Sequence, residues 1–225
     1  MWGKTRASSP VIAPDGLVRD LYTRLFLHAG GATSLVLGVT SALDQEGKTT
    51  TALNLASVLA SDRGVVDSTD GKGDVLVVDC HRSPITASHY LGVAPGPGLT
   101  DYLKRSRTLD DVICPTDRHY LKLMRAGDDP HNLSVLIRTE AMWNMIRTCR
   151  ERFRLTILDL PSVLTTSDTQ VLAGLVDRVV LVVRSGVTPA RAITDALTRV
   201  DRSKFVGIVL NDHRRDLPAW LDSRL

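Results

Sequence analysis

The chain has 225 residues, of which 43% are hydrophobic, and its formal net charge is +3. This length and composition suit one α/β domain with a substantial core, and so mild a charge does not require a nucleic-acid partner, so we expect none. Three scattered cysteines argue against a disulfide framework and a cysteine metal site. No signal-peptide core and no run near the ~20 apolar residues of a membrane span are present, so we expect a cytoplasmic protein.

The first 33 residues are expected to hold a loose segment and one helix. Residues 1–15 are rich in Ser and Pro, and we expect them to be flexible. Residues 16–28 have the apolar spacing of an amphipathic helix, which Gly30 and Gly31 would end. We expect this helix and everything after it, residues 16–225, to form a single domain.

The next stretch predicts a strand, a phosphate-binding loop and a helix. An apolar, β-branched run at 35–40 is followed by a turn, then Gly47-Lys48-Thr49-Thr50, then a helical pattern to about residue 59 or 61. Backbone N–H groups and a helix N-terminus make such a loop attractive to phosphate. Lys48 would contact the outer phosphates, the Thr49 hydroxyl would ligate Mg²⁺, and Gly47 would let the backbone approach the nucleotide.

This loop departs from the usual pattern at its start. Ala42 stands where the first glycine is expected, and Asp44 and Glu46 place negative charge near the phosphates. The alternative is an ordinary strand–helix turn that carries Gly-Lys-Thr by chance, although the flanking strand and helix are the context that the motif requires.

Strands and helices alternate through the rest of the sequence. A polar loop is expected at 62–74. Further strands are expected at 75–78, 121–124, 155–158, 179–183 and 206–210, short helices at 100–103, 109–113 and 218–225, and longer helices at 134–153, 167–176 and 189–200. In the long helix, Leu136, Ile137, Met142, Trp143, Ile146 and Cys149 are expected to form the apolar side. The alternation predicts an α/β fold, a doubly wound and mostly parallel sheet with helices on both faces, of the P-loop NTPase class.

Polar residues follow several of these strands. Asp79, Asp159 and Asn211 come directly after apolar runs, as the phosphate loop does. Ligands of such sheets bind beyond the carboxyl ends of the strands, so these residues are expected to converge there. Carboxylates at Asp79 and Asp159 suit an Mg²⁺–nucleotide site, and the Asn211 amide could contact adenine; each could also be a simple turn residue.

These segments together resemble the bacterial tyrosine kinases of capsule and exopolysaccharide synthesis, a group related to the partitioning and septum-site P-loop ATPases. The resemblance runs from about residue 16 to 211. It rests on EGKTTTALNLASVLA and VLVVDCHRSP as first and second motifs, on GLTDYL and LMRAGDDPHNLSVL, on FRLTILDLPSVLTTSDTQ as third motif, and on FVGIVLN.

The resemblance implies a protein that binds ATP and Mg²⁺, forms a homo-oligomer, often a ring, and works at the inner membrane through a partner. That partner would be a membrane polysaccharide co-polymerase that controls chain length and export. Carried over by position, Lys48, Asp79 and Asp159 would be catalytic, and Thr49, Asp79 and Asp159 would hold the metal. The nucleotide would be held by Glu46, Gly47, Lys48, Thr49, Thr50 and Asn211.

Several positions differ from the family pattern. His81 replaces the second acid of the second motif, and an imidazole cannot replace a carboxylate as base and metal-shell ligand without changing the chemistry. We do not expect His81 to ligate a metal. Gln45 replaces a glycine, and Thr23 and Phe26 stand where basic subunit contacts are expected. No tyrosine follows Tyr120, so we expect no autophosphorylation of a tyrosine-rich tail.

Three functions remain open from the sequence. An intact Gly-Lys-Thr motif and both aspartates favour a kinase-like ATPase. His81 and the missing tyrosines favour an inactive scaffold of the same machinery. A partitioning-type ATPase that dimerises on ATP is a further alternative, but neither Ala42 nor Leu43 supplies the extra lysine of that group.

Overall fold

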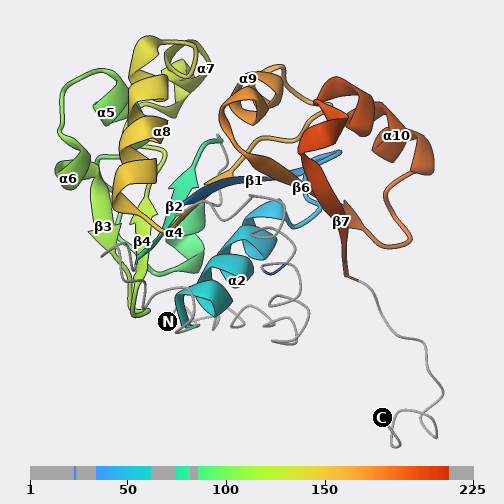
Figure 1. The fold of residues 1–225 in the computed structure, drawn as a ribbon, viewed down its shortest axis with the longest axis horizontal. Helices are drawn as coiled ribbons and strands as arrows, with labels where there is room; N and C mark the ends of the chain where they lie inside the picture. The colour runs from blue at the N-terminus through green and yellow to red at the C-terminus, as the bar shows by residue number, and fades with distance from the viewer. Residues whose placement is uncertain (1–22, 24–33, 62–73, 82–85, 213–225) are drawn as a thin grey trace, which may run out of the picture.

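A seven-stranded sheet in the order β3-β4-β2-β5-β1-β6-β7 forms the centre of the computed structural model (Figure 1). The structure describes residues 23, 34–61, 74–81 and 86–212. Among these, all neighbouring strands pair in parallel except β3 and β4, which are antiparallel. The strands are β1 (Leu35–Ser41), β2 (Val75–Asp79), β3 (Ile113–Pro115), β4 (Leu121–Met124), β5 (Leu155–Asp159), β6 (Arg178–Arg184) and β7 (Phe205–Asn211).

Helices cover both faces of this sheet, with α2 on one side and α8, α9 and α10 on the other (Figure 1). The α-helices are α2 (Lys48–Ser61), α4 (Ala87–Tyr90), α5 (Leu99–Leu103), α6 (Leu109–Val112), α7 (Leu133–Leu136), α8 (Glu140–Arg152), α9 (Asp168–Leu175) and α10 (Ala190–Arg199). Two 3₁₀ turns are η1 (Pro130–Asn132) and η2 (Arg202–Lys204).

Alternate residues of the central strands pack into two separate cores. In β1, Leu35 and Leu37 belong to the α2 side, whereas Val36 belongs to the side of α8 and α9. Strand β2 divides in the same way, with Val77 on the first side and Val78 on the second. Because both faces are covered, β1 and β2 are buried along their whole length, which agrees with the apolar runs in their sequences. The predicted fold class is confirmed.

The prediction of one long helix at 134–153 is wrong, because the structure has two helices, α7 and α8, separated at 137–139. Thr139 has the extended backbone of a helix N-cap, with φ −88° and ψ 160°, and its hydroxyl donates to the Leu136 carbonyl at 2.7 Å. Met142, Met145, Ile146 and Cys149 form the buried face of α8 at helical spacing, and Trp143 lies off this face with 62% of its surface exposed. The expectation that Trp143 lies on the apolar side is therefore wrong.

Two short elements were not expected. Ile113 was expected to end a helix but instead begins β3. This strand pairs with β4 in the antiparallel direction and forms the edge of the sheet. Helix α4 follows β2 after a gap in the described residues. The expected segments 1–15, 16–28, 62–74 and 218–225 lie outside the described residues, except for Asp74 and for Thr23, which is helical.

Candidate functional site

The carboxyl ends of β1, β5 and β2 lie next to one another at one edge of the sheet. Asp79 at the end of β2 is in register with Asp159 at the end of β5, and Asp159 is in register with Val39 of β1. Helix α2 begins at Lys48, six residues after Ala42, and its first turn reaches the same edge, where the Thr49 hydroxyl is 3.1 Å from His81 Nε2. The predicted convergence of these segments is what the structure shows.

The turn before α2 needs a glycine at position 47. Gly47 has φ +89°, and a Cβ there would lie 2.1 Å from Asn211 Nδ2. The Asn211 amide donates to the Glu46 carbonyl at 3.0 Å, so β7 holds the loop through its last residue. Gln45, which replaces a family glycine, also has a left-handed backbone, with φ +64°. Gln45 thus adopts the left-handed backbone that glycine usually provides, which costs ~1–2 kcal/mol of conformational energy at this residue.

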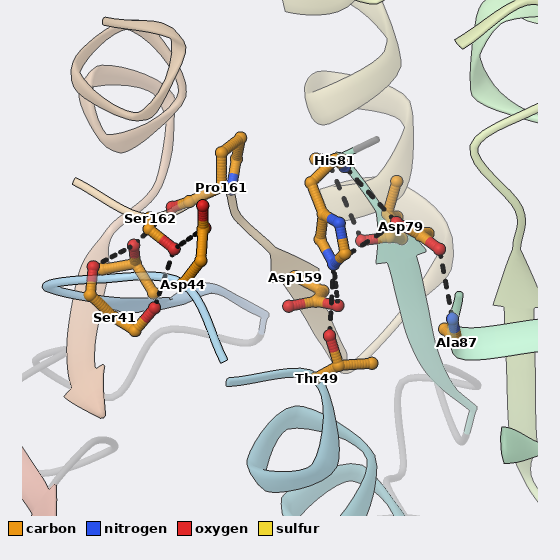
Figure 2. Close-up of polar contacts among 12 residues, drawn as sticks. Ser41, Asp44, Thr49, Asp79, His81, Ala87, Asp159, Pro161 and Ser162 are labelled. Carbon is orange, nitrogen blue, oxygen red and sulfur yellow. Dashed lines mark hydrogen bonds and ion pairs between the residues drawn. The ribbon is translucent and has the colours of Figure 1, made fainter. Parts of the chain in front are cut away.

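The two acids of the loop are held by neighbouring side chains. Glu46 is buried; its carboxylate accepts the Leu43 N–H at 2.8 Å and the Thr188 hydroxyl. Asp44 is exposed and accepts the Ser162 hydroxyl at 2.6 Å (Figure 2). The carboxylate of Glu46 is therefore engaged in shaping the loop.

Sequence reasoning missed Ser162 and Thr188. Ser162 follows Asp159 by three residues, and Thr188 lies just beyond β6. Both come after carboxyl ends of parallel strands, so the rule that singled out Asp79 and Asp159 could have found them.

Beside the loop, His81 lies between Thr49 and two buried aspartates (Figure 2). His81 Nε2 is 2.9 Å from Asp159 Oδ2, 3.1 Å from Thr49 Oγ1 and 3.9 Å from Asp79 Oδ1. Asp79 also accepts the backbone N–H groups of His81 at 3.3 Å and Ala87 at 3.2 Å. One imidazole thus connects all three sequence motifs.

These contacts shift the ionisation of the cluster. Burial raises the pKa of Asp79 to about 6; His81 opposes this increase and the charge of Asp159 adds to it. Burial alone would lower the pKa of His81, but its hydrogen bond to Asp159 and the charges of Asp159 and Asp79 raise that pKa above its ordinary value. Lys48 is near enough to counteract part of this rise. Close pairing of titratable groups is common at functional sites.

The oxygen atoms here fit a hydrated Mg²⁺, whereas the imidazole does not. Asp159 Oδ1 is buried and has no hydrogen-bond partner among the described residues, so it is free to accept from a metal-bound water. Thr49 Oγ1 and Asp159 Oδ2 are also suitable ligands, but both contact His81 Nε2. Because Mg²⁺ prefers oxygen, His81 would have to turn aside to let it reach them.

The remaining predicted residues lie in the first turn of α2. Lys48 and Thr50 are half-buried, and Thr51 N–H donates to the Gly47 carbonyl at 2.9 Å as the helix begins. A helix of 14 residues that begins this way presents unsatisfied N–H groups and positive potential to an anion. The arrangement can hold a phosphate group next to a divalent cation.

No protein-family model matches this chain. Among curated proteins, the tyrosine-protein kinase CpsD of Streptococcus agalactiae is 28% identical over 201 residues, which are 88% of this chain and 84% of CpsD. The succinoglycan biosynthesis transport protein ExoP of Rhizobium meliloti is 30% identical over 186 residues, which are 80% of this chain and 22% of ExoP.

Among solved structures, the kinase domain of the Escherichia coli tyrosine kinase ETK superposes with a TM-score of 0.81 at 25% identity, covering 94% of this chain and 80% of the other. The chain is a homologue of the bacterial tyrosine kinases. The cell division ATPase MinD of Pyrococcus furiosus matches with a TM-score of 0.65 at 20% identity, over 83% of this chain and 77% of MinD, which shows a shared P-loop NTPase fold alone. This tyrosine-kinase homologue has no helix among its described residues that could cross a membrane.

Proposed function

We propose that this chain is an ATP–Mg²⁺-binding, tyrosine-kinase-like P-loop ATPase that regulates polysaccharide polymerisation and export. The observation that carries the proposal is the position of the Gly47–Thr49 loop, at the start of α2 and facing the buried Asp79 and Asp159. This arrangement combines an anion site with carboxylates for a divalent cation, as phosphoryl transfer requires.

Each residue of the site has a proposed role. Lys48 binds the outer phosphates, and the backbone from Glu46 to Thr50 surrounds them. Thr49 and Asp159 hold Mg²⁺, and Asp79 orients the attacking hydroxyl or water. Asn211 supports the loop from the adenine side, an inference that its hydrogen bond to the Glu46 carbonyl favours. Magnesium would neutralise charge that develops on the phosphates.

The proposed partner is a membrane polysaccharide co-polymerase that regulates chain length. This chain spans 22% of ExoP and 28% of the tyrosine-protein kinase wzc of Salmonella typhi, so those relatives contain much that this chain does not match. We propose that residues 16–225 form one cytoplasmic domain, assemble as a homo-oligomer, and reach the inner membrane through this partner.

A second candidate function is a scaffold of the same machinery without catalysis. His81 Nε2 contacts the two oxygen ligands that Mg²⁺ would use, Thr49 Oγ1 and Asp159 Oδ2, and this contact favours weak or absent turnover. A dimerising partitioning-type ATPase has the fold likeness to MinD in its favour and the absence of the extra lysine against it.

Calorimetry with ATP and Mg²⁺ tests the proposal, with ADP release followed on the same sample. Lys48→Ala removes the phosphate contact, so we expect ATP binding to become undetectable. Lys122→Ala is the matched control, because Lys122 lies on β4 and its ammonium group pairs with Asp74 at 3.7 Å, away from the loop.

The outcomes separate the candidates. Binding with ADP release identifies an ATPase or kinase, and binding without release identifies a nucleotide-gated scaffold. Unchanged affinity in Lys48→Ala would refute the assignment of the site.

A further inference from the structure

Three possible metal ligands meet at the carboxyl ends of β2 and β5. One ligating atom each from Asp79, His81 and Asp159 lies within 4.8 Å of the others, and all three residues are buried. His81 Nε2 points at the carboxylates, 2.9 Å from Asp159 Oδ2 (Figure 2). Imidazole nitrogen and carboxylate oxygen are ligands that first-row transition metals accept together.

The hydrogen bonds of this cluster are incomplete. Nε2 carries at most one hydrogen, yet it faces Asp159 Oδ2, Thr49 Oγ1 and Asp79 Oδ1. Asp159 Oδ1 is buried with no partner among the described residues. Two adjacent carboxylates with no exposed surface are costly to bury unless positive charge compensates them, and both are paired with the same imidazole, which carries at most one positive charge. A divalent cation would supply the missing charge and a partner for Asp159.

We propose that the nucleotide-free protein binds one transition-metal ion, of the Zn²⁺ or Co²⁺ type, through His81 Nε2 and the carboxylates of Asp79 and Asp159. Ligands of a tetrahedral ion lie ~2.0–2.2 Å from it and therefore ~3.3–3.6 Å apart. His81 Nε2 is 2.9 Å from Asp159 Oδ2 and 3.9 Å from Asp79 Oδ1, so shifts of about half an ångström would bring both pairs to that spacing. Thr49 Oγ1 is 3.1 Å from His81 Nε2. The coordination position on the side of Thr49 would therefore be left for a water molecule or a phosphate oxygen.

This inference reverses the sequence-based expectation that His81 does not ligate a metal. It deepens the proposed nucleotide site and rests on it for its biological meaning, because Asp79 and Asp159 would serve both. The nitrogen ligand is the feature that selects the ion: Mg²⁺ takes oxygen ligands and dehydrates reluctantly, whereas Zn²⁺ and Co²⁺ bind imidazole well.

The test titrates the full chain with Co²⁺, followed by visible d–d absorption, and with Zn²⁺ and Mg²⁺ by calorimetry, all without nucleotide. We expect one equivalent of Co²⁺ or Zn²⁺ to bind at least tenfold more tightly than Mg²⁺. His81→Gln should weaken Co²⁺ binding at least tenfold, and His81→Asp should reduce the preference over Mg²⁺. His89→Ala is the control, because His89 is an exposed histidine on α4 outside the cluster.

Absence of Co²⁺ binding, or Co²⁺ binding that His81→Gln leaves unchanged, would overturn the inference. Circular dichroism of each variant confirms that it is folded before it is titrated. ATP binding is measured on the same samples, which separates the two proposals. If the parent chain binds ATP with Mg²⁺ but does not bind Co²⁺, the metal inference alone is overturned. If the parent chain binds Co²⁺ but no ATP, the nucleotide proposal alone is overturned.

Discussion

Single residues set the shape of the phosphate loop. Two independent constraints favour glycine at position 47: its φ is +89°, and an added Cβ would collide with the Asn211 amide. Gln45 and Ala42, where the resemblance leads one to expect glycine, are tolerated in this loop: Gln45 adopts φ +64°, and Ala42 is fully buried without a positive φ. The loop therefore depends on one glycine and on the side chains around it.

Gly47→Ala is expected to destabilise the protein by ~1–2 kcal/mol, since alanine disfavours the left-handed backbone, and to displace the Asn211 amide. Urea unfolding measures the free energy of unfolding. The control is Gly174→Ala in α9, where an added Cβ would contact nothing within 4 Å and where we expect a gain of ~0.5–1 kcal/mol. Equal effects of the two substitutions would contradict the account of the loop.

His81 is the residue at which the site differs most from the expected chemistry. Its ring lies between the helix that follows the phosphate loop and the ends of β2 and β5. An aspartate at this position would add a third carboxylate to the cluster, whereas histidine adds a donor and a nitrogen ligand. Position 81 therefore carries the difference between the oxygen-only site expected from the sequence and the mixed-ligand site that we propose.

At the scale of elements, the separation of α7 from α8 changes which residues stabilise the fold. Thr139 begins a new helix, and from it Met142, Met145, Ile146 and Cys149 face the core. Trp143 lies on the outer side of α8 with 62% of its surface exposed. Its role is therefore not that of a core aromatic residue.

Met145→Ala is expected to lower the free energy of unfolding by ~2–5 kcal/mol, because a fully buried side chain leaves a cavity. Trp143→Ala should change the free energy of unfolding by no more than ~0.5 kcal/mol, since most of the indole is exposed to solvent and packs little against the core. Chemical denaturation followed by circular dichroism compares both variants with the parent. A large loss from Trp143→Ala would contradict the placement of Trp143 on the exposed side of α8.

At the scale of the whole molecule, the sheet order places the end of β5 between those of β1 and β2. Asp159 therefore lies at the centre of the site, next to the loop after β1 on one side and to Asp79 on the other. Helix packing on both faces holds these strands, so stability of the core and geometry of the site are linked.

Alkaline pH should weaken the whole fold through Cys149, whose burial in the core raises the pKa of its thiol from 9.0 to about 12. The thiol keeps its proton in the folded state and loses it near pH 9 when unfolded, so the folded state binds more protons between these values. The free energy of unfolding then falls as pH rises through this range, by up to ~1.4 kcal/mol per pH unit from this group.

Urea unfolding at several values between pH 8 and the onset of irreversible damage measures this slope. Cys149→Ala should lower stability at every pH and make the alkaline slope shallower. Cys114→Ala is the comparison, because Cys114 is only half-buried in β3. An unchanged slope in Cys149→Ala would contradict the prediction.

The sequence by itself determined the fold class, the phosphate loop and the edge of the sheet where the site lies. Those features depend on local patterns: apolar runs for strands buried on both faces, Gly-Lys-Thr before a helix, and polar residues at strand ends. The same patterns could not show β3, whose short strand exists only because β4 pairs with it.

Only the tertiary structure decided how the site residues face one another. The Asn211 side chain reaches the Glu46 carbonyl across 165 residues of sequence, and Thr49 meets the ring of His81 across 32. Such contacts follow from the order of the strands and the direction of side chains at their ends, neither of which a local pattern encodes. The placement of His81 against both aspartates is therefore a property of the folded chain.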